Sequence, residues 1–110
     1  MGTFPCSRLT INGPALRLNY QLLRRKVGPS CDVAAVVKAD GYGLGIDAVV
    51  PVFEEAGCSF FYVAQLEEAL VLRSLTERKI AVLGGMPEGS EKEFRHLNLI
   101  PVLNTPDEVA

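Results

Sequence analysis

The sequence has no tryptophan, a single histidine and only three cysteines, and neither sign of charge is in large excess. Its 11 Lys and Arg against 13 Asp and Glu leave a net charge of −2, without the basic surface that nucleic-acid binding needs. One histidine with Cys6, Cys31 and Cys58 forms neither a zinc-ligand pattern nor a disulfide framework, so we expect no metal. We expect the cysteines to be small apolar side chains in a reducing cytoplasm.

Long hydrophobic runs are also absent. The longest span about five residues, as at 33–37 and 60–64, well short of the ~18 of a membrane-spanning helix. The first residues lack the basic start and apolar stretch of a secretory signal. With 48% hydrophobic residues the chain is still too apolar to be disordered. We therefore predict a soluble, cytoplasmic globular chain of one domain at most, with no membrane partner.

Short apolar runs alternate with amphipathic stretches along the chain. The runs are rich in β-branched or apolar side chains and predict buried strands at 32–37, 59–64, 79–83 and 99–103. Helical spacing of apolar residues predicts helices at 13–27, 47–56, 65–75 and 90–97. Such alternation predicts an α/β fold with parallel strands, either an open doubly wound sheet or part of a (β/α)8 barrel.

Two prolines predict where helices start or are interrupted. Pro51 lies within the second predicted helix, so we expect that helix to start late or to kink. Pro106 follows Thr105 and precedes Glu108, a strong helix start with almost no chain after it. We therefore interpret the chain as a truncated fragment of a longer protein.

One segment concentrates the chemistry: Lys38 ends the first predicted strand, and a loop with Gly41, Tyr42, Gly43 and Gly45 follows. In either α/β architecture, the carboxyl end of a parallel strand faces the ligand site. An amine held there among apolar neighbours loses solvation, which favours its neutral, nucleophilic form and Schiff-base chemistry. The glycines could bring the backbone close to a ligand and offer N–H groups to an anion, and the tyrosine could reach a phosphate.

The string VVKADGYGLG resembles the pyridoxal-phosphate attachment motif of the alanine racemase family, commonly written AVVKANAYGHG. The family's N-terminal strand and helix resemble RLTINGPALRLNYQLLRR, and its next strand and helix resemble FYVA with EA-x-x-LR. The resemblance runs over essentially the whole chain. This sequence departs from the motif at Asp40, Gly41 and Leu44, where the family usually has Asn, Ala and His.

The resemblance implies a fold-type III pyridoxal-phosphate enzyme. It implies that residues 1–110 form the N-terminal half of a (β/α)8 TIM-type barrel, which is truncated. Residues 1–12 would be a leading strand outside the barrel, and the C-terminal β domain would be absent. It also implies that Lys38 binds pyridoxal 5'-phosphate as a Schiff base and acts as one catalytic acid and base. Tyr42 would contact the phosphate, and Leu83 would line the cofactor pocket. A tyrosine of a partner subunit, beyond residue 110, would be the second base.

The implied reaction interconverts L-alanine and D-alanine, supplying D-alanine for the bacterial cell wall, in a homodimeric parent enzyme. This fragment alone is expected to be inactive. Two other functions stay open: a broad-specificity amino-acid racemase, and a non-catalytic pyridoxal-phosphate-binding barrel protein. Because strands five to eight of a barrel would be missing, we expect the chain to self-associate through its open sheet edges.

Overall fold

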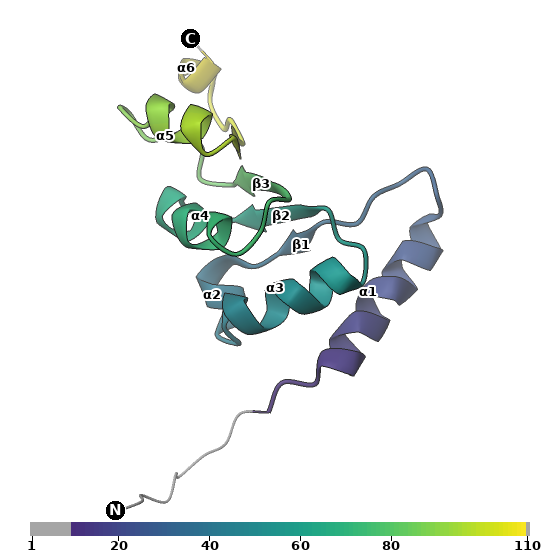
Figure 1. The fold of residues 1–110 in the computed structure, drawn as a ribbon. Coiled ribbons are helices and arrows are strands. Elements are labelled where there is room, and N and C mark those ends of the chain that lie inside the picture. Colours follow the sequence, from purple (N-terminus) through teal and green to yellow (C-terminus); the bar gives the residue numbers. More distant parts are fainter. Residues whose placement is uncertain (1–9, 110) are drawn as a thin grey trace, which may run out of the picture.

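A computed structural model of the chain describes residues 10–109 and contains one sheet of four parallel strands in the order β1-β2-β3-β4. Figure 1 shows the helices following one another along the sheet. In chain order the elements are α1 (Gly13–Val27), β1 (Ala35–Val36), α2 (Lys38–Tyr42), α3 (Ile46–Glu55), β2 (Phe60–Val63), α4 (Leu66–Arg73), β3 (Lys79–Val82), α5 (Glu91–His96), β4 (Leu99–Pro101) and α6 (Pro106–Val109). The predicted α/β fold with parallel strands is confirmed. The expected leading strand over residues 1–12 falls largely outside the described residues.

One face of the sheet is packed against helices. Its residues alternate with those of the other face and form the core with α3, α4 and α5; the strands contribute Ala35, Phe61, Val63, Ile80, Val82 and Leu99. On the opposite face, Val36 and Ile100 each stay 40% exposed. Since every strand pairs with its successor and crossovers are right-handed, the connecting helices all lie on one side. In a doubly wound sheet the helices would cover both faces, so this arrangement excludes that alternative. Sequential parallel strands with helices on one side are the arrangement found in part of a barrel.

Helix α1 precedes β1 and packs outside the sheet, beside α3 (Figure 1). Tyr20 links the layers: its hydroxyl donates to Val33 O at 2.7 Å, and its ring lies edge-on to Phe53. Burial raises the pKa of Tyr20 above 10.0, and the Cys58 thiol adds to this. Cys58 is fully buried as expected, whereas Cys31 is exposed, so for Cys31 that expectation was wrong.

The predicted late start at Pro51 is wrong. Helix α3 begins at Ile46 and contains Pro51, with Gly45 as the residue before its first turn. Pro51 is exposed, so the Asp47 carbonyl, which would receive the missing N–H, lies where water can reach the helix surface. Within residues 10–109, no helix is both long enough and apolar enough to cross a membrane.

Candidate functional site

Lys38 is the second residue after β1 and the first residue of α2. The preceding residue, Val37, is buried and donates its N–H to Tyr62 O at 2.9 Å, which is the last hydrogen bond joining this strand end to β2. Lys38 itself is half-buried. The structure thus has the predicted lysine at the carboxyl edge of the sheet, where ligands of α/β proteins bind.

The backbone after Lys38 turns in the left-handed sense. Ala39, Asp40, Gly41 and Tyr42 have φ of 53°, 54°, 67° and 58°, and Gly43 follows with 83°. Only glycine adopts this conformation without steric cost, so a run in which three of the first four residues are not glycine forms a strained turn. Strain of this kind persists only where surrounding contacts hold it, and it is concentrated at functional sites.

The three glycines of the loop serve the turn rather than an anion. Each has a positive φ, and each N–H donates to a carbonyl of the same segment: Gly41 to Val37 at 2.9 Å, Gly43 to Ala39 at 2.9 Å and Gly45 to Asp40 at 2.8 Å. The prediction that these N–H groups would bind an anion is therefore wrong. The glycines are needed because the chain reverses so sharply between β1 and α3.

Asp40 connects the turn to the next helix. Its Oδ1 accepts the N–H of Ile46, the first residue of α3, at 3.0 Å. A carboxylate at a helix N-terminus is favourable because the first N–H groups of a helix have no partner within it. The departure from Asn at this position therefore leaves the loop well anchored.

Glu68, on α4, was not singled out from the sequence as a site residue. Its Oε2 accepts the N–H of Ala39 at 2.5 Å, and its Oε1 accepts those of Ala64 at 2.7 Å and Gln65 at 3.1 Å. One carboxylate thus joins the turn after Lys38 to the end of β2; we call these three hydrogen bonds the Glu68 bridge. The signal available in the sequence was the spacing Gln65-x-x-Glu68, which is typical of a capping box.

The other two predicted site residues lie at the same edge of the sheet. Tyr42 is the last non-glycine residue of the left-handed turn and is 62% exposed. Leu83 follows β3, is half-buried, and donates its N–H to Val63 O at 2.8 Å. Lys38 and Leu83 therefore follow the ends of β1 and β3 with β2 between them. The structure brings the three predicted residues to one edge, and their roles stay predictions.

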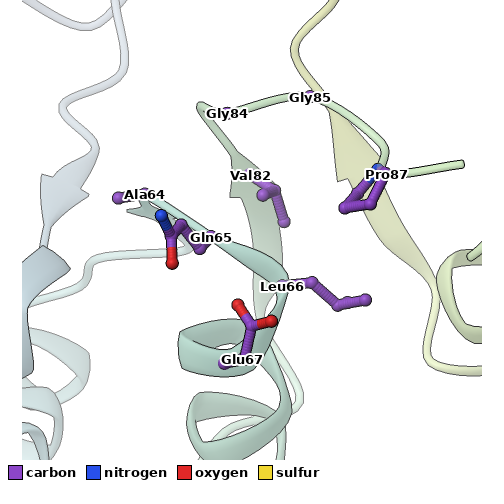
Figure 2. A pocket seen from close by; sticks show the side chains of 8 residues that line it. All are labelled: Ala64, Gln65, Leu66, Glu67, Val82, Gly84, Gly85 and Pro87. Atoms are coloured by element: carbon purple, nitrogen blue, oxygen red, sulfur yellow. The ribbon is translucent and has the colours of Figure 1, made fainter.

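A cavity of about 300 Å³ lies close by but does not include these residues. Figure 2 shows it between the start of α4, with Gln65 and Leu66, and the end of β3, with Val82 and Gly84. Val82 belongs to the helix-covered face of the sheet. Its other lining residues include Ala64 and Gly84, which follow the ends of β2 and β3, and Lys38 does not line it. Within the described part of the chain, no three His, Cys, Asp or Glu side chains gather closely enough to hold a metal.

Comparison with known proteins places this arrangement in context. The family model described as alanine racemase, N-terminal domain, matches residues 11–110. Alanine racemase of Rhodospirillum rubrum is 44% identical over 103 residues, which is 92% of this chain and 28% of that protein. The catabolic alanine racemase of Agrobacterium fabrum is 45% identical over 104 residues, covering 93% of this chain and 26% of that protein.

A solved structure gives the same result. The crystal structure of alanine racemase from Bartonella henselae, with covalently bound pyridoxal phosphate, superimposes with a TM-score of 0.83 and 40% identity. The match covers 90% of this chain and 28% of that one. The chain thus spans little more than a quarter of the length of the relatives it matches.

Proposed function

Because the chain belongs to the alanine racemase family through that family's N-terminal domain, we propose that it is the cofactor-binding part of a pyridoxal-phosphate-dependent alanine racemase. The observation that carries this proposal is Lys38, half-buried at the carboxyl edge of β1 and followed by a strained, well-anchored turn. An amine in such a setting is suited to covalent bonding with an aldehyde.

The side chains at this edge fit the chemistry of pyridoxal phosphate. Lys38 supplies an amine for the aldehyde carbon, and Leu83 supplies an apolar surface for the ring. The hydroxyl of the exposed Tyr42 donates to no group within residues 10–109, which leaves it available to a phosphate oxygen. When bound, the cofactor supplies a conjugated ring that accepts the electron pair left on the substrate Cα by loss of its proton.

Lys38 then has two tasks in succession. Its Nζ would first hold the cofactor covalently, and the same amine would then be close to the Cα of a bound substrate. As a free base the amine would take the proton from one face of Cα and become an ammonium group, and that ammonium group would return the proton to the same face. Racemisation needs a second acid and base on the opposite face. We propose that this group, a tyrosine of a partner subunit, lies outside these 110 residues and that the chain alone is inactive.

Three features of the whole enzyme complete the proposal: it is a homodimer, it acts in the cytoplasm, and it supplies D-alanine for the bacterial cell wall. The support is family membership together with the length of the chain, which covers 28% of the Rhodospirillum rubrum enzyme. A site divided between two subunits also agrees with a chain that has Lys38 but lacks an assigned second base.

The test is chemical trapping on the 110-residue chain. Pyridoxal phosphate is added, the covalent bond to an amine is made permanent with borohydride, and the modified lysine is located by peptide mass mapping. We expect Lys38 to be labelled at least tenfold more than Lys26, Lys79 or Lys92, because those three are exposed surface amines.

Lys38→Ala is the control and should abolish the selective label while leaving the circular dichroism spectrum unchanged. Racemisation of L-alanine by the chain alone should not exceed that of Lys38→Ala. Equal labelling of all four lysines would contradict the proposed cofactor site.

A further inference from the structure

The turn after Lys38 depends on a residue from another unit of the fold. We propose that Glu68 is a positioning residue: the Glu68 bridge fixes the left-handed turn against the end of β2 and so holds the Lys38 amine where the cofactor is captured. The inference deepens the proposed function and rests on it, since Lys38 is the residue positioned.

The two oxygens of the Glu68 carboxylate accept hydrogen bonds from different parts of the chain. Oε1 accepts the N–H groups of Ala64 and Gln65, which lie between β2 and α4, while Oε2 accepts the N–H of Ala39, immediately after Lys38. Ala39 and Glu68 are 29 residues apart in the sequence. The Oε2 bond is therefore a link between two βα units, whereas the Oε1 bonds belong to the N-terminus of Glu68's own helix.

The strain in the turn explains why such a link is needed. Ala39 has φ of 53° without glycine's freedom, so the free chain prefers other conformations. On one side, Asp40 fixes the turn to α3; on the other, Glu68 fixes it to β2 and α4. Without the second anchor, residues 38–41 would be held by β1, by the bond from Ile46 to Asp40 and by backbone hydrogen bonds within the loop, with no link to β2 beyond Val37.

The carboxylate of Glu68 strengthens the bond. Glu68 is half-buried and, with Val37, Asp40, Ile46, Val63 and Val71, lines a largely apolar cavity of about 240 Å³. The Oε2 bond to Ala39 is itself exposed, but a hydrogen bond to a carboxylate is stronger than one to a neutral acceptor. Nothing in the fold of α4 alone requires Glu68 to reach the neighbouring unit.

Glu68→Gln tests the link selectively. Glutamine keeps one acceptor oxygen, which can still serve Ala64 and Gln65, but its NH2 group cannot accept from Ala39. Glu67→Gln is the matched control, because Glu67 is exposed, lies in the same helical turn and undergoes the same change of charge. Glu68→Asp is a second variant that keeps the charge but is one methylene too short to span both partners.

The first readout needs no cofactor: amide hydrogen exchange, by NMR, on the 110-residue chain. We expect Ala39 to exchange roughly tenfold faster or more in Glu68→Gln than in Glu67→Gln, with Ala64 little changed. The second readout is the concentration of pyridoxal phosphate that gives half-maximal labelling of Lys38, which should rise about tenfold in Glu68→Gln and in Glu68→Asp but not in Glu67→Gln.

The outcomes separate this inference from the proposed function. If the unsubstituted chain shows no selective labelling of Lys38, the proposed function fails, and the exchange of Ala39 still decides whether the bridge holds the turn. If Ala39 exchanges equally in Glu68→Gln and Glu67→Gln, the bridge is refuted. Faster exchange of Ala39 with unchanged labelling of Lys38 would also overturn the inference, because Glu68 would then be structural only.

Discussion

At the scale of single residues, the stretch 39–43 is the least ordinary part of this chain. Five consecutive residues have φ between 53° and 83°, and three of them are not glycine. Each non-glycine residue in this conformation costs about 1–2 kcal/mol, so the turn is built against local preference. Contacts from Asp40 and Glu68 offset that cost by connecting the turn to α3 and α4. The strained turn therefore keeps a fixed shape beside Lys38.

Tyr42→Phe tests the proposed role of the tyrosine. The ring is 62% exposed, so we expect the substitution to leave the free energy of unfolding unchanged within about 0.5 kcal/mol. Loss of a hydrogen bond to a phosphate should weaken pyridoxal-phosphate binding roughly tenfold. The measurement is the half-saturating cofactor concentration for labelling of Lys38. Unchanged affinity in a stable variant would contradict a phosphate contact.

The candidate site shows what a sequence pattern can and cannot predict at this scale. Lys38 and Tyr42 were predicted because the pattern that indicates their roles, a strand end followed by a glycine-rich loop, consists of residues adjacent in the sequence. Glu68 was not among the predicted site residues. Its link to Ala39 joins positions far apart in the sequence, and such contacts exist only once β1 and β2 have paired.

At the scale of helices and strands, the apolar runs predicted every strand, but the observed strands are shorter. The run 32–37 gives the paired strand Ala35–Val36, and 59–64 gives Phe60–Val63. Hydrophobicity reports burial, which extends beyond the paired residues, as Val37 and Cys58 illustrate. The predicted helix began at residue 47, one residue after the observed start at Ile46, because the side chain that anchors the first turn, Asp40, lies in the preceding turn.

The ends of β2 and β3 approach each other at a glycine, which gives a prediction for this pair of strands. A Cβ at Gly84 would lie 2.7 Å from Ala64 O, which is closer than their van der Waals contact distance. The carbonyl oxygen is part of the backbone and the Cβ is bonded directly to it, so neither atom can move away by a side-chain rotation. We expect Gly84→Ala to destabilise the fold by about 1–3 kcal/mol and to displace the neighbouring Leu83. The measurement is the free energy of unfolding from urea denaturation.

Gly13→Ala is the matched control for that substitution. Its Cβ would meet Val52 at an ordinary 3.5 Å, and Gly13 lies in helix α1, where alanine is favoured over glycine. Gly13→Ala should therefore be neutral or slightly stabilising. If Gly84→Ala proved as stable as Gly13→Ala, close packing of the two strand ends would not be required.

At the scale of the whole molecule, the order of the strands in the sheet decides between the two folds that the sequence allowed. The sequence alone left an open doubly wound sheet and part of a barrel as alternatives, because both alternate strands and helices. The strand order β1-β2-β3-β4 has no reversal, and the core helices formed by residues 10–109 pack on one face of the sheet, while Val36 and Ile100 stay exposed on the other. A sheet that winds in one direction with helices on one side has the geometry of a barrel wall.

That geometry predicts self-association of the 110-residue chain. The uncovered face carries Val36, Tyr62 and Ile100, and β1 and β4 are unpaired along their outer edges within the described residues. Exposed strand edges beside apolar surface favour pairing with another chain. We expect sedimentation velocity to show a mean mass that rises with protein concentration.

We expect this association to occur through the uncovered face of the sheet and not through nonspecific hydrophobic contacts elsewhere on the surface. Ile100→Lys puts a charge on that face near the β4 edge and should weaken association about fivefold or more, since charged side chains protect sheet edges. Leu70→Lys is the matched control, because Leu70 is similarly exposed but lies on the outer surface of α4. A monomer whose sedimentation does not change with concentration would contradict the prediction. An equal effect of both lysines would instead locate the contact on the helical side of the sheet.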